Sequence, residues 1–230
     1  MSERADVVDL VVAGAGPAGA AAAITAARAG LRVVVCDKAT FPRDKTCGDG
    51  LTTAALRHLE HLGLDLRSLP GVEPVRETVL VSPSGRRIAL PIPHDGLHVV
   101  VVQREVLDAA LLDVVRAAGV QVREGAAVTD VVANGSSVKV VLSDGGTVEA
   151  PFLVAADGHW STVRRKVEPH APSDRGEWHA ARQYFSDVIP LDGRIWVLFE
   201  PDLLPGYAWV FPLPGGRANV GFGEIGRAHV

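Results

Sequence analysis

The sequence lacks several features that would mark particular classes of protein. Its two cysteines, Cys36 and Cys47, are too few for a disulfide framework, which favours a reducing compartment. The 23 basic residues do not outnumber the 27 acidic ones, so no basic field would attract a nucleic acid. The cysteines and histidines lack the spacing of zinc ligands, and no metal site is expected. What remains is an ordinary globular composition, in which 47% hydrophobic residues can form a large core.

The sequence also shows no pattern typical of a signal peptide or of a membrane-spanning helix. Met1 to Asp9 carries charges and no apolar core before a cleavage site. The apolar stretch Leu10 to Ala27 is interrupted by glycines and Pro17, and it divides into a strand pattern and a helix pattern. We therefore expect a cytoplasmic protein, and peripheral contact with a membrane stays open.

The first residues predict a βαβ unit. Val7 to Ala13 is a continuous, largely β-branched run, typical of a strand buried on both faces of a parallel sheet. Ala18 to Ala29 is alanine-rich and is followed by Gly30, which predicts a helix with a glycine stop. Leu31 to Cys36 is a second apolar run, so the two strands should be parallel neighbours.

The rest of the chain predicts an α/β fold with a second, mainly antiparallel region. Helices are expected at Leu51 to Gly63 and Arg104 to Ala118. Short strands are expected at Thr78 to Val81, Arg86 to Leu90, Leu97 to Val102, Val120 to Val122, Ala127 to Val132, Val138 to Leu142, Thr147 to Ala150, Phe152 to Ala155, Ile195 to Phe199, Tyr207 to Phe211 and Ala218 to Phe222. We expect a Rossmann-like domain with a parallel central sheet over residues 1–168, a partial antiparallel domain over 169–224, and strands from 76–102 joining the second sheet.

A glycine-rich turn carries the clearest functional signal. Gly14 to Gly19 reads G-A-G-P-A-G and lies between the first predicted strand and helix. Gly14 allows a tight turn, Gly16 lets main-chain amides approach a pyrophosphate, and Gly19 lets the helix pack closely on the strand. Asp37 follows about 20 residues on, where an acid can bind ribose hydroxyls. The pattern predicts a dinucleotide site; the alternative is a glycine turn without a ligand.

NAD and FAD share this fingerprint, and later segments favour FAD. Leu153 to Arg164 contains A-A-D-G-H-W-S-T-V-R, which resembles the G-A-D-G-x-x-S-x-V-R segment of FAD-dependent oxidoreductases of the para-hydroxybenzoate hydroxylase type. Ala155 stands where that pattern usually has glycine. The resemblance implies that Asp157 and Gly158 lie near FAD, that Arg104 reaches the ribose and diphosphate, and that the strand at Ala127 and Val128 receives the adenine.

Two further segments resemble the geranylgeranyl reductase family. Pro42 to Leu51 is similar to its P-R-x-K-x-C-G-x-G segment, and Gly206 to Pro212 is similar to its G-Y-x-W-x-F-P segment. Asn219 to Gly223 matches the N-V-G-x-G sequel. The resemblance implies that reduced flavin delivers hydride to a carbon–carbon double bond of an isoprenoid or lipid-like substrate, with NAD(P)H or another electron donor. It says nothing of the oligomeric state.

The residues of these segments allow plainer interpretations. Cys47 can be a reactive thiol or a small packed residue. Tyr207, Trp209 and Phe211 share one strand face, where they line an apolar cavity or fill a sheet core. The residues expected nearest the reaction are Cys47, Gly48 and Trp209. The residues expected at the cofactor are Gly14, Gly16, Pro17, Ala18, Gly19, Asp37, Lys38, Arg43, Cys47, Gly48, Asp49, Gly50, Arg104, Val128, Asp157 and Gly158.

Two other functions stay open at this point. One is an aromatic-ring monooxygenase of the same fold, which would incorporate oxygen; a halogenase fits less well. The other is a non-catalytic fragment that binds nucleotides. Geranylgeranyl reductases continue with a G-D-A-A-G segment that is missing here, and Ile225 to Val230 corresponds to the codons of a common sequencing adapter. We therefore expect an incomplete copy with a non-native tail at 225–230 and weak retention of FAD.

Overall fold

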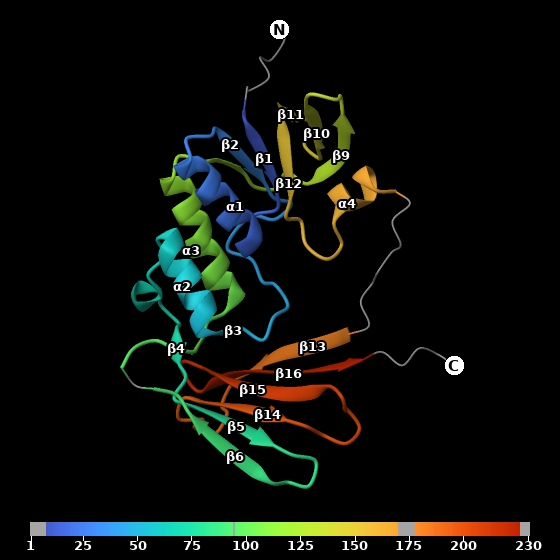
Figure 1. The fold of residues 1–230 in the computed structure, drawn as a ribbon. Helices are drawn as coiled ribbons and strands as arrows, with labels where there is room; N and C mark the ends of the chain where they lie inside the picture. Colours follow the sequence, from blue (N-terminus) through green and yellow to red (C-terminus); the bar gives the residue numbers. More distant parts are fainter. Residues whose placement is uncertain (1–7, 94, 170–177, 226–230) are drawn as a thin grey trace, which may run out of the picture. The chain divides into compact units, whose positions relative to one another are not determined.

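Two interleaved units make up the fold, each drawn from two stretches of the chain. The first comprises Met1–Arg43 and Asp108–Asp174, and the second comprises Asp44–Leu107 and Arg175–Val230. The computed structural model describes residues 8–93, 95–169 and 178–225 (Figure 1). The expected division near residue 168 stays a prediction, since the chain also passes from one unit to the other near residues 43 and 107.

The first unit is built on a parallel sheet of four strands in the order β12-β1-β2-β8. Strands β1 (Leu10–Ala13), β2 (Val33–Cys36), β8 (Gln121–Arg123) and β12 (Phe152–Ala155) are all parallel to their neighbours. Helix α1 (Pro17–Arg28) connects β1 to β2 and packs on both. The predicted βαβ unit is confirmed for the described residues; Val7 lies outside them.

A three-stranded antiparallel sheet covers one face of this parallel sheet. Its strands are β9 (Val128–Ala133), β10 (Val138–Leu142) and β11 (Thr147–Ala150), in the order β11-β10-β9. Val11 and Val34, paired across β1 and β2, join Val140 and Leu142 of β10 in one buried cluster. Because side chains alternate along a strand, Val12 points to the other face, toward Gly19 of α1. Short helix α4 (Thr162–Val167) follows β12 and contacts β9.

The second unit is dominated by a six-stranded sheet in the order β13-β16-β15-β14-β5-β6. Its strands are β13 (Trp178–Phe185), β16 (Arg217–Ile225), β15 (Tyr207–Leu213), β14 (Arg194–Leu198), β5 (Glu77–Val81) and β6 (Arg87–Pro91). All neighbours are antiparallel except β14 and β5. The expected antiparallel region is therefore confirmed. Strand β13 was not predicted, because its sequence does not alternate cleanly between apolar and polar residues.

A smaller sheet and two helices complete the second unit. Strands β3 (Gly50–Leu51), β7 (Val100–Val101) and β4 (Glu73–Pro74) pair in the order β3-β7-β4. Helix α2 (Thr53–Leu62) starts two residues later than predicted, because Leu51 pairs in β3 and Thr52 caps the helix through its hydroxyl. A short 3₁₀ turn, η1 (Leu66–Ser68), follows. The strand expected over Leu97 to Val102 shortens to the two paired residues of β7.

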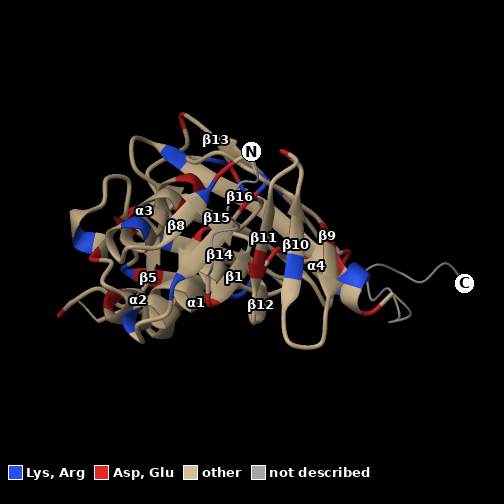
Figure 2. Ribbon diagram, turned by 90° about the horizontal axis from the view of Figure 1, so that it is seen from above, with Lys and Arg blue, Asp and Glu red and all other residues tan. Residues whose placement is uncertain are grey.

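Helix α3 (Arg104–Ala117) begins in the second unit and continues into the first. It was predicted almost to the residue, and Leu111, Leu112 and Val115 on one side of it are fully buried. Acidic and basic residues are interspersed over the ribbon of both units (Figure 2). Across residues 8–93, 95–169 and 178–225 no helix is long and apolar enough to cross a membrane, and no group of acids, histidines or cysteines is placed to hold a metal ion. Of the expected non-native tail, Ile225 ends β16 and residues 226–230 lie outside the described residues.

Candidate functional site

The glycine turn after β1 has no room for side chains at two of its positions. Gly14 has a φ of +99°, and a Cβ there would lie 2.3 Å from the main-chain oxygen of Ala156. A Cβ on Gly19 would lie 1.8 Å from the oxygen of Gly14. Both contacts are with main chain, which cannot move aside, so glycine is required at these positions.

The turn leads into the N-terminus of α1, a helix of 12 residues. Gly16 is its N-cap residue and has no side chain to satisfy the first amides, and Pro17 stands in the first turn. No acid lies in that turn. A helix start without an acid or a capping side chain, approached through main chain alone, suits an anionic phosphate.

Asp37 joins the end of β2 to the glycine turn. Its Oδ2 accepts a hydrogen bond from the amide of Ala15 at 2.7 Å, and its Oδ1 accepts one from the amide of Ala39 at 2.8 Å. Each carboxylate oxygen keeps further acceptor capacity, so the acid could also receive a ribose hydroxyl. Asp37 thus has a structural role that the sequence pattern alone did not reveal.

The end of β12 lies beside the same turn. A Cβ on Gly14 would come within 3.0 Å of the Cα of Asp157. Asp157 accepts hydrogen bonds from the Ser161 hydroxyl at 2.6 Å and from the amides of Thr162 and Val163 at 2.7 and 3.1 Å. It therefore holds the N-terminus of α4. Together the carboxyl ends of β1, β2 and β12 form the edge at which parallel α/β sheets bind their ligands.

Other expected cofactor residues of the first unit have different surroundings. Arg43 forms an ion pair with Asp108, with 3.0 Å between Nη1 and Oδ2, and its guanidinium lies 4.7 Å from the ring centre of Phe41. Asp108 is completely buried, so this pair ties α3 to the segment after β2. Lys38 is exposed next to Asp37, and Val128 packs on the core of the first unit. Their roles as cofactor ligands stay predictions.

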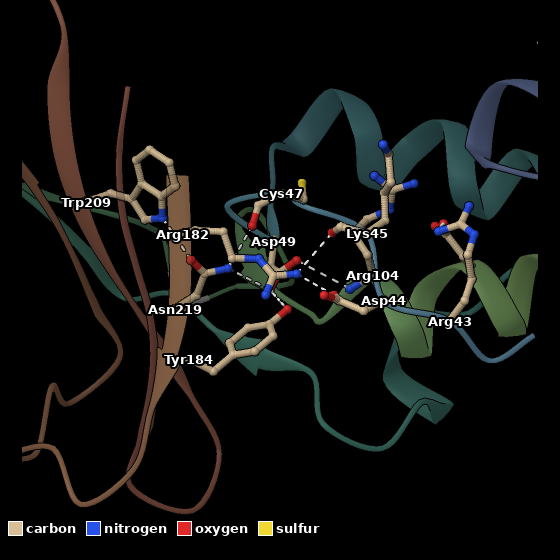
Figure 3. Close-up of polar contacts among 11 residues, drawn as sticks. Arg43, Asp44, Lys45, Cys47, Asp49, Arg104, Arg182, Tyr184, Trp209 and Asn219 are labelled. Atoms are coloured by element: carbon tan, nitrogen blue, oxygen red, sulfur yellow. Dashed lines mark hydrogen bonds and ion pairs between the residues drawn. The ribbon is translucent and has the colours of Figure 1, made fainter. Parts of the chain in front are cut away.

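In the second unit, the segment 44–50 lies against one face of the six-stranded sheet. Arg182 and Tyr184 of β13, Trp209 of β15 and Asn219 of β16 share this face, because Tyr184 is opposite Asn219 and Gly221 is opposite both Arg182 and Trp209. All four point to the segment or to a residue that binds it (Figure 3). We call these four side chains, together with Asp49, the Asp49 network.

Asp49 lies at the centre of the Asp49 network. Its Oδ2 accepts hydrogen bonds from the Tyr184 hydroxyl and from the Asn219 amide, both at 2.7 Å. Its Oδ1 accepts a longer one, 3.3 Å, from the amide of Arg104 at the start of α3. Asn219 also donates to the main-chain oxygen of Cys47 at 2.8 Å and accepts from the Trp209 indole at 2.9 Å. Arg182 contacts the Asp44 carboxylate and donates to the oxygen of Lys45 at 3.2 Å.

Burial dominates the electrostatics of this cluster. Asp49 is 1% exposed, and burial raises the pKa of its carboxyl above the ordinary value, while the bonds from Tyr184 and Asn219 and the charge of Arg182 act in the opposite direction. Burial and the bond to Asp49 raise the pKa of the Tyr184 hydroxyl. The guanidinium of Arg182 lies 4.2 Å from the ring centre of Tyr184, and the hydroxyl of the same ring donates to Asp49. Tyr184 therefore keeps its proton and acts as a donor.

Aromatic rings support the same segment from the sheet. Tyr207, Trp209 and Phe211 share one face as predicted, with ring centres 6.2 and 6.3 Å apart. A Cβ on Gly50 would lie 2.9 Å from the Phe211 ring, and a Cβ on Gly48 would lie 3.5 Å from the same ring. Phe211 packs against the core and Trp209 is buried, while Tyr207 is 40% exposed. These three rings therefore fill the core at the Phe211 end. That they line an apolar cavity stays a prediction.

The opposite face of these strands carries a hollow of about 430 Å³. Ala181, Ala208 and Phe222 are opposite one another on that face. The hollow is lined mainly by apolar side chains, and its residues are Ala181, Arg182, Gln183, Phe185, Leu203, Ala208, Val220, Gly221 and Phe222. The sequence patterns did not single out this surface.

The expected site residues thus form two groups. Gly14, Gly16, Gly19, Asp37 and Asp157 meet in the first unit, and Cys47, Gly48, Asp49, Gly50, Arg104 and Trp209 meet in the second. Sequence reasoning missed Arg182 and Tyr184, because β13 was not recognised, and it quoted Asn219 only as part of a motif. Arg182 and Tyr184, a cation and a phenol beside the Cys47 segment, were therefore not predicted.

Comparison with known proteins identifies the family. The sequence profile described as "FAD binding domain" matches residues 7–193. The chain is 38% identical to a menaquinone reductase of Mycolicibacterium smegmatis, covering 99% of this chain and 57% of that protein. It is 30% identical to digeranylgeranylglycerophospholipid reductase 1 of Methanococcoides burtonii, covering 96% and 55%.

A solved structure agrees. A geranylgeranyl bacteriochlorophyll reductase-like protein of Thermoplasma acidophilum superposes with a TM-score of 0.82 at 25% identity, over 95% of this chain and 57% of that one. The resemblance to geranylgeranyl reductases is confirmed, and the chain spans a little over half the length of these relatives. With a match over most of its residues, the chain belongs to the FAD binding domain family of oxidoreductases.

Proposed function

We propose that this chain binds FAD and belongs to a reductase that saturates carbon–carbon double bonds in the isoprenoid chain of a lipid or quinone. The observation that carries the first part is the glycine turn: main chain closes on Gly14 and Gly19 so tightly that no side chain fits, as a pyrophosphate site requires. The relatives named for menaquinone and for a geranylgeranyl lipid support the second part.

The residues of the first unit fit FAD in type and place. The amides at Gly16 and the start of α1 would hold the diphosphate, because the helix dipole and the unpaired N–H groups favour negative charge. Asp37, already aligned by two amides, would receive ribose hydroxyls. When bound, FAD supplies hydride transfer, and the protein's part is to bind, orient and exclude water.

An isoprenoid chain requires apolar surface, and the second unit offers some. The hollow of about 430 Å³ on the sheet is of the size found for small-molecule sites, and apolar side chains such as Phe222, Ala208 and Val220 line it. This surface favours a hydrocarbon ligand over a compact polar one. The electron donor, NAD(P)H or another reductant, is part of the same proposal.

The test measures product mass with the purified 230-residue chain. The chain is loaded with FAD, the flavin is reduced chemically without oxygen, and menaquinone or a geranylgeranyl lipid is added. We expect the product mass to increase by two hydrogens for each saturated double bond, and no increase when FAD is left out. An increase of one oxygen atom when air is admitted would favour an aromatic monooxygenase instead. Stoichiometric, reducible FAD with no saturated product would refute the reductase.

A further inference from the structure

The orientation of the Asn219 amide is settled by its neighbours. The Trp209 indole N–H can only donate a hydrogen bond, so the atom of Asn219 that faces it must be the oxygen. The amide nitrogen therefore has its two N–H groups directed at the Cys47 oxygen and at Asp49. Asn219 is completely buried, and its oxygen and both N–H groups are thus engaged, which makes it a rigid link between β15 and the 44–50 segment.

Asp49 is held by both its side chain and its main chain. Its φ is +65°, a left-handed conformation that is unfavourable for a residue other than glycine. Its carboxylate accepts three hydrogen bonds, and its main-chain oxygen accepts one from the amide of Val102 at 2.9 Å. The network selects this conformation over the ones that an isolated loop would adopt.

The consequence falls on Cys47 and the glycines beside it. With its carbonyl bound to Asn219, the sulfur of Cys47 is turned away from Asn219 (Figure 3). A Cβ on Gly50 would lie 2.9 Å from the Phe211 ring, and a Cβ on Gly48 would be in ordinary contact with Phe211 and Trp209, at 3.5 and 3.6 Å. The hydrogen bonds to Asp49 and to the Cys47 oxygen, together with the contacts to the Trp209 and Phe211 rings, hold the main chain from Cys47 to Gly50 in one arrangement on the sheet.

We propose that Asp49, Asn219 and Tyr184 are positioning residues, which hold the Cys47–Gly50 main chain in the single conformation that the flavin-dependent reduction requires. None of the three needs to touch the reacting atoms; they act through the main chain of the segment. The link to the reaction rests on the proposed function. Whether the three residues fix the conformation of the Cys47–Gly50 main chain can be tested on the chain without FAD or substrate.

The first measurement is the rate at which iodoacetamide alkylates Cys47, located by peptide mass mapping. Cys36 does not compete, because it is 1% exposed and burial raises the pKa of its thiol to about 11. Asp49→Asn keeps the size of the side chain and tolerates positive φ, but it sets an NH₂ group against a donor. We expect Cys47 to react at least about tenfold faster in Asp49→Asn, the factor typical for a lost hydrogen bond to a charged group, and to be accelerated less in Tyr184→Phe.

A matched control is available in the same unit. Asp187 also has a positive φ, +55°, but it is exposed and has no part in the Asp49 network. Asp187→Asn therefore makes the same change of charge and backbone preference away from the segment. Its alkylation rate should equal that of the unchanged chain. Equal rates in Asp49→Asn, Tyr184→Phe and Asp187→Asn would overturn the proposal, whatever the flavin assays give.

The second measurement links the segment to the reaction. In FAD-loaded Asp49→Asn we expect kcat for the saturation of menaquinone to fall about tenfold, while KM and the Kd for FAD change less than twofold, as for an interaction needed in the transition state alone. An equal loss in kcat and in FAD affinity would mean a merely structural role and overturn the proposal. If the unchanged chain binds FAD but saturates nothing, the proposed function fails, and the alkylation rates alone decide whether the network holds the segment.

Discussion

Single residues show that a pattern predicted for ligand binding also has a structural role. Asp37 was predicted as a ribose ligand, and in the structure its carboxylate also ties β2 to the glycine turn through the amides of Ala15 and Ala39. The glycines of the turn permit close packing, and in the proposed function they also leave room for a diphosphate. A substitution at these positions therefore tests both properties, and a suitable control has to separate them.

Gly14 and Gly30 separate the cost of the close packing from the cost of a positive φ. Both have a positive φ, +99° and +85°, but only Gly14 has main-chain atoms where a Cβ would stand. Gly30→Ala should cost about 1 kcal/mol of unfolding free energy, because L residues rarely adopt this conformation. Gly14→Ala should cost roughly 3 kcal/mol or more, because the oxygen of Ala156 cannot yield. Urea unfolding measures both, and equal costs would contradict the close approach.

Cys36 predicts a pH dependence of stability. Burial raises the pKa of its thiol from 9.0 to about 11. Between these two values the unfolded chain loses the thiol proton while the folded chain keeps it, so stability is complete below pH 9.0 and falls as the pH rises toward about 11. The loss amounts to about 2–3 kcal/mol.

The measurement is the free energy of unfolding at several pH values for the unchanged chain and for Cys36→Ala. Other groups titrate in both proteins, so the difference between the two curves isolates the thiol. The free energy of unfolding of the variant differs by a constant amount at every pH, because its side chain is smaller. Above pH 9.0 it should decline less steeply than that of the unchanged chain. Parallel curves would show that the thiol ionises equally in the folded and unfolded chains.

At the scale of elements, strands β15 and β16 explain the N-V-G-x-G motif. A Cβ on Gly221 would lie 2.4 Å from the Trp209 ring and 2.5 Å from the oxygen of Ala181. On Gly223 the nearest atom would be 3.7 Å away, which is ordinary contact. The first glycine of the motif therefore makes room for the indole that binds Asn219, whereas the second has ample space.

The two glycines of β16 form a matched pair for experiment. Gly221→Ala should destabilise the protein by roughly 2–4 kcal/mol and move the indole N–H resonance of Trp209 in the NMR spectrum, because ring and Cβ cannot share the space. Gly223→Ala should change stability by less than about 1 kcal/mol and leave that resonance in place. Two variants of equal stability would refute the packing of Trp209 on Gly221.

At the scale of the whole molecule, the predicted ligand belongs to one unit. If FAD binds the glycine turn of the folded chain alone, the free energy of unfolding rises with FAD concentration, by about 2.7 kcal/mol at a hundredfold excess over Kd. Hydrogen exchange should slow most at residues 14–20 and at Asp37 to Ala39, and least at β9 to β11. Protection spread evenly over the chain, or none, would contradict a site at the turn.

Periodicity and glycine spacing were enough to predict most helices and strands of this chain, although strand β13 was missed. The strand at Leu10–Ala13, the helix after Pro17, the hairpin of β5 and β6 and the long helix α3 follow from apolar patterns and turn residues. The glycine turn and Asp37 could be assigned for the same reason, because their signal lies within one βαβ unit. These features depend on neighbours in sequence, and a sequence records them directly.

Only the tertiary structure brought the second group of residues together. Asp49 and Asn219 are 170 positions apart, and Tyr184 lies on a strand without an alternating pattern. Their contact depends on the register of β13, β16 and β15, which long-range pairing sets and no local pattern encodes. The sequence by itself thus determined the glycine turn after β1, while the contacts around the Cys47 segment were decided by strands that meet only when the chain has folded.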